Sequence, residues 1–185
     1  MEGLNDFSVI FLTGLVIKLM DDYLDQEIDR LNGRKTLVLR LERGILPYVL
    51  ILMTFSSLID PYLTVSLFWA SYIIGMGMDM DGNKLPTGLK AYQEVIVMLG
   101  LGFIALDKEE FIFSLAIMLF IQLLDDYIDY YLEEFINRDN FINYLGKGGT
   151  VLLSFLSLVI SLGISWERSV IVIFATPIVV WLLHR

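Results

Sequence analysis

Apolar runs separated by short polar stretches dominate the chain. Most are close to the roughly 20 residues that a perpendicular helical crossing of a bilayer needs, although several fall short of it. The polar stretches IDPY (59–62) and ISWERS (164–169) fit tight turns between neighbouring helices. The pattern predicts seven apolar helices. They lie at about 7–28, 45–59, 62–78, 90–106, 111–132, 149–164 and 168–184.

If the seven spans alternate in direction, their loops fall on two sides of the membrane, and the basic residues are divided unevenly between these sides. The side that contains the chain's C-terminus holds Arg30, Arg34, Lys35, Arg40, Arg43, Lys84, Lys90, Arg138, Lys147 and Arg185. The other side holds only Lys108 and Arg168. Cytoplasmic loops carry an excess of Lys and Arg. We therefore predict the N-terminus outside and the C-terminus in the cytoplasm.

Composition supports a membrane protein. Of the 185 residues 56% are hydrophobic and 19% charged, and the mean hydropathy is +0.68, whereas soluble domains average about 45–50% apolar and about 25% charged. The chain has no cysteine, which excludes disulfides and thiol chemistry. His184 lies at the end of the chain, a poor place for a catalytic base. The net charge of −9 excludes nucleic acid as a partner.

The acidic residues are concentrated in two similar sequences, KLMDDYLDQEID (18–29) and QLLDDYIDYYLE (122–133). A shift of 104 residues lays LMDDYLD on LLDDYID, and pairs Lys18 with Gln122 and Asp29 with Glu133. The same shift pairs Leu41 with Leu145. We interpret the chain as one transmembrane domain with repeat halves at about 1–104 and 105–185. Internal repeats of membrane proteins often place the site at their interface, which predicts a central cavity between the two acidic helices.

Each acidic sequence brings carboxylates together on one face of a helix. Residues three, four or seven apart share a face, so Asp22, Asp25 and Asp29 group together, with Asp21 four residues before Asp25. In the second sequence Asp125, Asp126, Asp129 and Glu133 group in the same way. Such like charges repel and need compensation near a bilayer. All-oxygen ligation suits a hard cation such as Mg²⁺.

Mg²⁺ commonly completes its shell with phosphate oxygens of a substrate, which predicts a diphosphate between the two sequences. Basic residues beyond each cluster, Arg34, Lys35, Arg138 and Lys147, are candidates to bind that anion. Further candidates are Tyr23, Tyr127, Asn83 and Lys84. Each of these assignments has an alternative. The acidic residues could form a solvated helix boundary, and the tyrosines could lie at the membrane interface. DMDGN (79–83) could begin a calcium loop, although Lys84 follows where glycine is needed.

The two sequences resemble the aspartate-rich motifs, N/D-D-x-x-D-x-x-x-D, of the UbiA-type intramembrane prenyltransferases. DDYLDQEIDRLNGRKTLVLRLERG (21–44) looks like the first motif with its loop, and DDYIDYYLEEFINRDNFINYLGKGG (125–149) like the second. KLPTGLKAYQEVIVMLGLGFIAL (84–106) resembles the segment leading into the middle helix of that family. The resemblance covers nearly the whole chain and implies an all-α polytopic bundle around a central cavity.

The resemblance also implies Mg²⁺-dependent transfer of a prenyl group from a polyprenyl diphosphate to a lipophilic or aromatic acceptor in the membrane. Asp22, Asp25, Asp126 and Asp129 would act in catalysis. The first metal site would comprise Asp21, Asp22, Asp25 and Asp29, and the second Asp125, Asp126, Asp129 and Glu133.

The chain departs from the family pattern in three respects. Family members usually have about nine spans, whereas hydropathy gives seven here. The second motif ends in Glu133 instead of Asp, and the Arg-Pro pair that often follows the first motif is missing. We therefore expect a reduced or diverged member, and a homodimer is one way to complete its cavity. A membrane terpene cyclase, a divalent-cation transporter and an inactive homologue are the alternatives.

Overall fold

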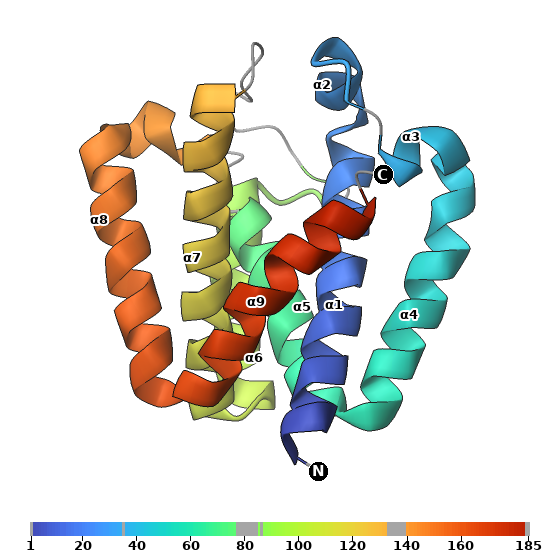
Figure 1. The fold of residues 1–185 in the computed structure, drawn as a ribbon. Helices are drawn as coiled ribbons and strands as arrows, with labels where there is room; N and C mark the ends of the chain where they lie inside the picture. Colours follow the sequence, from blue (N-terminus) through green and yellow to red (C-terminus); the bar gives the residue numbers. More distant parts are fainter. Residues whose placement is uncertain (1, 35, 77–84, 86, 133–139, 184–185) are drawn as a thin grey trace. The chain divides into compact units, whose positions relative to one another are not determined.

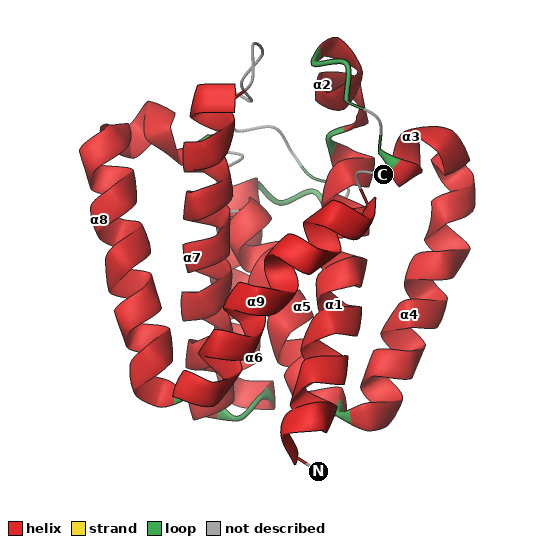
Figure 2. Ribbon diagram, in the orientation of Figure 1, coloured by secondary structure: helices red, strands yellow, loops and turns green. Residues whose placement is uncertain are grey.

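The computed structural model describes residues 2–34, 36–76, 85, 87–132 and 140–183. These residues form helices and connecting turns and contain no β-strand (Figure 2). The helices are α1 (Glu2–Leu24), α2 (Gln26–Leu31), α3 (Leu37–Leu41), the 3₁₀ helix η1 (Glu42–Gly44), α4 (Ile45–Ile59), α5 (Pro61–Met76), α6 (Ala91–Ala105), α7 (Lys108–Leu132), α8 (Phe141–Ile164) and α9 (Trp166–Leu183). The predicted all-α fold is confirmed.

Six of the seven apolar segments predicted from the sequence each correspond to one of these helices, and the first corresponds to α1 and α2 together. The helices differ in length. In the described part of the chain, four are long and apolar enough to cross a membrane: Gly3–Leu24, Lys108–Leu132, Phe141–Ile164 and Trp166–Leu183. A helix of 15 residues such as α4 extends only about 22 Å, less than the roughly 30 Å of a hydrocarbon core. The count of seven spans therefore stays a prediction.

The first helix ends earlier than its hydropathy predicts. The expected segment 7–28 is divided into α1, which ends at Leu24, and α2, which begins at Gln26. The chain bends at Asp25, although the Asp25 and Asp29 N–H groups still donate to the carbonyls four residues before them, both at 2.9 Å. Aspartate is a weak helix former, and like charges four residues apart repel, so this acidic sequence is where a helix is easily bent.

Local capping explains where α5 and α7 begin. Asp60 Oδ1 accepts from the N–H groups of Tyr62 (2.9 Å) and Leu63 (3.0 Å), and Pro61 occupies the first position of α5, where no N–H is needed. Asp107 Oδ1 accepts from the N–H groups at the start of α7 at 3.0 and 3.1 Å. The turns predicted at 59–62 and 164–169 lie at helix boundaries, where Asp60 and Ser165 are the single residues between helices.

The contacts group the chain into two compact units, Met1–Val65 with Trp166–Arg185, and Ser66–Ser165. In the first unit α1 packs against both α4 and α9 (Figure 1). Its core contains Val9, Val16, Ile45 and Val179. A chain of buried hydroxyls also runs through it: Ser56 Oγ lies 2.8 Å from both Thr13 Oγ1 and Thr64 Oγ1. These bonds connect α1, α4 and the start of α5.

In the second unit α7 packs against α8 and α6 (Figure 1). Its core contains Phe111, Phe113, Ile117 and Leu123. The buried Gly102 of α6 lies against the ring of Phe111, at a place where any Cβ would overlap that ring. Two side chains connect α5 with α6: Trp69 Nε1 donates to the Met98 carbonyl at 3.2 Å, and the Tyr72 hydroxyl donates to Glu94.

The 104-residue correspondence extends from the acidic sequences to the segments that follow them. Thr36 caps α3 and Asn140 caps α8, and these residues are 104 apart. Glu42 and Gly146, again 104 apart, both have a positive φ where the chain turns from a short helical segment into a long one. The compact units do not coincide with the halves 1–104 and 105–185, because α9 groups with α1 and residues 66–104 group with α7 and α8.

Candidate functional site

The first acidic cluster, which comprises Asp21, Asp22, Asp25 and Asp29, lies where α1 passes into α2. Asp22 is buried, with only 2% of its side chain exposed, and Asp21 is more open. Lys18, one turn earlier on α1, places its Nζ 2.9 Å from Asp21 Oδ2 and 3.2 Å from Asp22 Oδ1. One ammonium group therefore contacts two carboxylates, as the spacing of Lys18 and Asp22 predicts.

Asp25 lies at the bend between α1 and α2, half-buried. Burial, and after it the negative charges of Asp21, Asp29 and Asp22, raise its pKa to about 7, while the Lys18 ammonium acts in the opposite direction. The other three carboxylates of the cluster thus lie close enough to Asp25 to oppose its ionisation, which is the condition that a bound cation relieves.

Asp29 is held by the loop that follows α2. Gly33, with φ +68°, donates its N–H to the Arg30 carbonyl (3.2 Å), and Arg34 N–H donates to the Asp29 carbonyl (2.9 Å). This is the Schellman arrangement, which ends a helix at a left-handed glycine. It returns the chain so that Arg34 Nη1 lies 3.6 Å from Asp29 Oδ1. A predicted anion-binding residue and a predicted metal ligand are therefore neighbours.

The described carboxylates of the second acidic cluster are Asp125, Asp126 and Asp129, on the last turns of α7. Asp126 is buried, with 7% exposed, and Gln122 Nε2 donates to its Oδ1 at 3.0 Å. Its Oδ2 accepts from the Phe141 N–H at 2.6 Å, and its carbonyl accepts from Asn140 Nδ2 at 2.9 Å. Asp126 thus fastens the end of α7 to the beginning of α8.

The two clusters have the same local structure. Within each D-D-Y-x-D sequence the first aspartate is half-buried, the second buried, the tyrosine half-buried, the following apolar residue exposed and the last aspartate half-buried. In both, the side chain four residues before the buried aspartate contacts its Oδ1: Lys18 contacts Asp22 and Gln122 contacts Asp126. The two clusters are therefore similar in the environments of their side chains as well as in amino-acid sequence.

The candidate anion-binding residues are only partly within the described chain. Tyr23 and Tyr127 lie half-buried inside their motifs. Lys147, on the first part of α8, lies over the rings of Tyr130 and Tyr131, 4.4 and 5.0 Å from their centroids. Lys35, Asn83, Lys84, Glu133 and Arg138 lie outside the described residues, as do DMDGN (79–83) and His184.

The donor chemistry of the first cluster fits Mg²⁺, because its donor atoms are all oxygen and the charges of Asp21, Asp29 and Asp22 add to burial in raising the pKa of Asp25. In the arrangement described, the cations beside these carboxylates are Lys18 and Arg34. Among the residues that the structure describes, no three acidic or histidine side chains gather round one point as metal ligands. Metal binding by these residues therefore stays a prediction.

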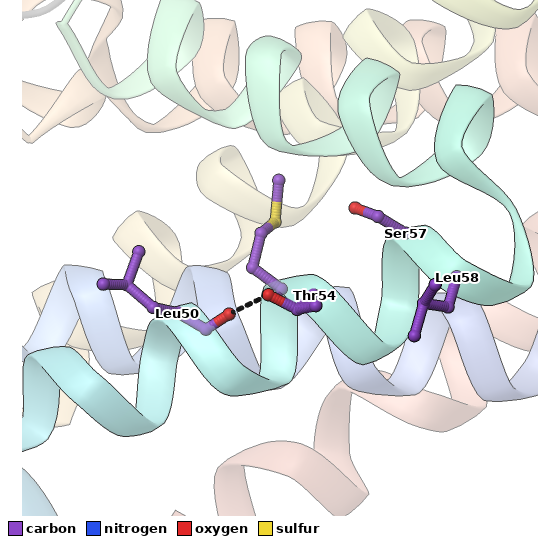
Figure 3. Close-up of a pocket in the computed structure, with 5 residues that line it drawn as sticks. Leu50, Thr54, Ser57 and Leu58 are labelled. Atoms are coloured by element: carbon purple, nitrogen blue, oxygen red, sulfur yellow. Dashed lines mark hydrogen bonds between the residues drawn. The ribbon is translucent and has the colours of Figure 1, made fainter.

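Two hollows lie on the exposed face of α4, with volumes of about 310 and 340 Å³. Leu50 and Thr54 line both, and Ser57 and Leu58 belong to the larger one (Figure 3). Neither of these hollows is lined by an acidic residue, so neither is the predicted cavity. The central cavity stays a prediction.

Sequence reasoning missed the roles of Thr36, Asn140 and Gln122. The 104-residue shift contains the signal, because it pairs Thr36 with Asn140 as helix caps and Lys18 with Gln122 as partners of the buried aspartates. Comparison of the chain with protein-family models, curated proteins and solved structures finds no match. Function is therefore inferred from the residues of this chain alone.

Proposed function

We propose that this protein is a membrane prenyltransferase, which moves a prenyl group from a polyprenyl diphosphate to a lipophilic or aromatic acceptor with Mg²⁺. The observation that carries the proposal is the duplicated acidic cluster. Both copies end apolar helices, α1 and α7, and both bury the second aspartate of the motif. A solvated helix boundary needs neither a buried carboxylate nor a matched second copy.

The chemistry assigned to the site is ionisation of an allylic diphosphate. Bound Mg²⁺ would neutralise the charge that develops on the diphosphate as the carbon–oxygen bond breaks. Asp21, Asp22, Asp25 and Asp29, with Asp125, Asp126, Asp129 and Glu133, are the proposed metal ligands. Arg34, placed beside Asp29 by the Gly33 turn, is proposed to bind the diphosphate.

The apolar part of the protein is proposed to hold the prenyl chain and to exclude water. The allylic carbocation left by ionisation is captured by the acceptor, which loses a proton. Exclusion of water strengthens the electrostatic interactions and prevents capture by hydroxide or water. The four membrane-length helices support a membrane setting. The cytoplasmic location of both motifs and the homodimer belong to the proposal.

The test uses the full chain, purified in detergent, with an allylic prenyl diphosphate and Mg²⁺, and measures released diphosphate. We expect release from the wild type and at least a hundredfold loss in Asp25→Asn and Asp129→Asn. Asp60→Asn and Asp107→Asn are matched controls, because asparagine caps a helix as well as aspartate, and we expect them to retain activity. No release from any allylic diphosphate would overturn the proposal. Analysis of the organic products separates transfer from cyclisation.

A further inference from the structure

The two acidic clusters share their local structure but differ in the charge beside the buried aspartate. Position 18 is a lysine, and position 122, its equivalent, is a glutamine. Both side chains reach forward one turn and contact Oδ1 of the buried aspartate, at 3.2 Å from Lys18 and 3.0 Å from Gln122. The first cluster therefore contains a fixed positive charge where the second contains a neutral amide.

The position of Lys18 makes that charge effective. Its side chain is only 16% exposed, and its ammonium group contacts Asp21 as well as the buried Asp22. Charges at an open surface are screened by water and salt, but partly buried pairs are screened much less. A divalent cation approaching Asp21 and Asp22 would therefore meet the Lys18 charge at short range and would have to compete with it for the same oxygens.

We infer that the two clusters bind divalent cations unequally, and that Lys18 is a built-in counter-ion that weakens binding at the first cluster while Gln122 leaves the second cluster the tighter site. This inference rests on the proposed function. It gives the site an order of loading: the second cluster fills at low metal concentration, and the first fills only when metal displaces Lys18 or when a substrate anion attracts it. Lys18 thus affects metal binding indirectly, by pairing with the carboxylates of Asp21 and Asp22, and does not itself contact the metal.

The alternative is that Lys18 has a structural role only, neutralising buried Asp22. The repeat provides a matched pair of variants that distinguishes the two roles, since Lys18→Gln gives the first cluster the residue of the second and Gln122→Lys does the reverse. A unit charge a few ångströms from a divalent ion changes its affinity by roughly tenfold or more even when strongly screened. A structural role alone predicts changes of stability but no reciprocal change of metal affinity.

The experiment titrates the full chain in detergent with Mn²⁺ alone, as a paramagnetic substitute for Mg²⁺, and measures free Mn²⁺ by electron paramagnetic resonance. We expect two classes of site in the wild type. Asp129→Asn should remove the tight class and Asp25→Asn the weak class. Lys18→Gln should tighten the weak class by about tenfold, and Gln122→Lys should weaken the tight class by a similar factor.

Far-UV circular dichroism and gel filtration check that each variant is folded. If Lys18→Gln does not fold, Gln122→Lys decides the matter alone. This inference is overturned if the wild type binds Mn²⁺ but neither substitution changes the affinities. It is also overturned if the two clusters of the wild type bind Mn²⁺ with equal affinity. Both outcomes leave the proposed function standing. No Mn²⁺ binding at either cluster overturns both.

Discussion

Glu42 and Gly146 lie 104 residues apart, and both have a positive backbone φ, 48° and 67°. Each follows a short helical segment that begins at an equivalent cap, Thr36 or Asn140, and each precedes a long helix. The sharp turn is therefore part of the repeated unit. Glycine adopts a positive φ without a steric penalty, whereas glutamate adopts it only at a steric cost.

The first prediction concerns two substitutions at these positions, glycine to alanine at 146 and glutamate to glycine at 42. Gly146→Ala should reduce the free energy of unfolding by about 1–2 kcal/mol, because alanine is strained at positive φ. Glu42→Gly should be neutral or stabilising, since its contact with Arg30 is exposed and long, at 4.0 Å. Thermal unfolding in detergent measures both. Gly148→Ala is the control, because no atom lies within 4 Å of the added methyl and the residue is helical. Equal effects at positions 146 and 148 would contradict the argument.

The sequence predicts the helices well because their signal is local. The range 45–59 coincides with α4, and the expected 90–106 differs from α6 by one residue at each end. The acidic end of the first helix was predicted less well: 7–28 ignores the bend at Asp25, where hydropathy has no information about repulsion between carboxylates. The packing of α9 with α1 depends on long-range contacts that no local pattern contains.

For the candidate site, the sequence predicts which residues repeat but not what each one contacts. The contact of Lys18 with Asp22 is one that their spacing of four residues on a helix allows. The bond from the Phe141 N–H to Asp126 joins residues 15 apart, across a connection whose path the sequence does not fix. Nor does the sequence show which glycines lie in close packing: a Cβ at Gly102 would overlap the Phe111 ring, whereas a Cβ at Gly75 or Gly100 would meet no atom within 4 Å.

The second prediction uses Gly102. A methyl group there overlaps the Cζ and Cε1 atoms of the buried Phe111 ring, so Gly102→Ala should destabilise the second unit by about 1–3 kcal/mol. Gly100→Ala should be neutral or slightly stabilising, because its methyl meets no atom within 4 Å and alanine favours a helix. Chemical unfolding in detergent measures the difference. Phe111→Leu should partly rescue Gly102→Ala, and an absence of rescue would argue against this contact as the cause.

The third prediction concerns the buried hydroxyls of the first unit. Ser56 Oγ contacts Thr13 Oγ1 and Thr64 Oγ1, each at 2.8 Å. Ser56→Ala leaves both threonines with a lost partner and should cost about 1–3 kcal/mol. Ser57→Ala, one residue away at the hollow on α4 (Figure 3), should have little effect. Thermal unfolding measures both variants, and equal melting temperatures would exclude a stabilising network.

The fourth prediction tests whether the Gly33 turn positions Arg34. Gly33→Ala should cost about 1 kcal/mol, because the position has φ +68°. It should also weaken binding of inorganic diphosphate in the presence of Mg²⁺, since the Arg34–Asp29 contact depends on that turn. Gly33→Asn is the control, because asparagine tolerates the left-handed conformation, and should keep most of the affinity. Calorimetry measures binding. If Gly33→Ala loses stability but keeps the diphosphate affinity of the wild type, Arg34 does not bind the anion in the way proposed.

The fifth prediction follows from the pKa of Asp25, which burial and then the Asp21 charge raise from 3.8 to about 7. The folded protein binds this proton more tightly than the unfolded chain. Its stability therefore falls as the pH rises from about 4 to about 7, and the cost is fully present above that range. Asparagine does not titrate, so Asp25→Asn should be more stable than the wild type by at least about 1 kcal/mol at pH 8. The difference should vanish near pH 4.

Thermal unfolding of the metal-free protein in detergent with chelator, repeated from pH 4 to pH 8, measures this divergence. Asp107→Asn is the control, since this exposed cap should give a curve parallel to that of the wild type. A stabilising Asp25→Asn at pH 8 would mean that the charged carboxylate is kept at a cost to the fold. That is expected of a residue retained for its charge and not for packing. Parallel curves for Asp25→Asn and the wild type would instead make Asp25 an ordinary solvated acid and weaken its assignment to the site.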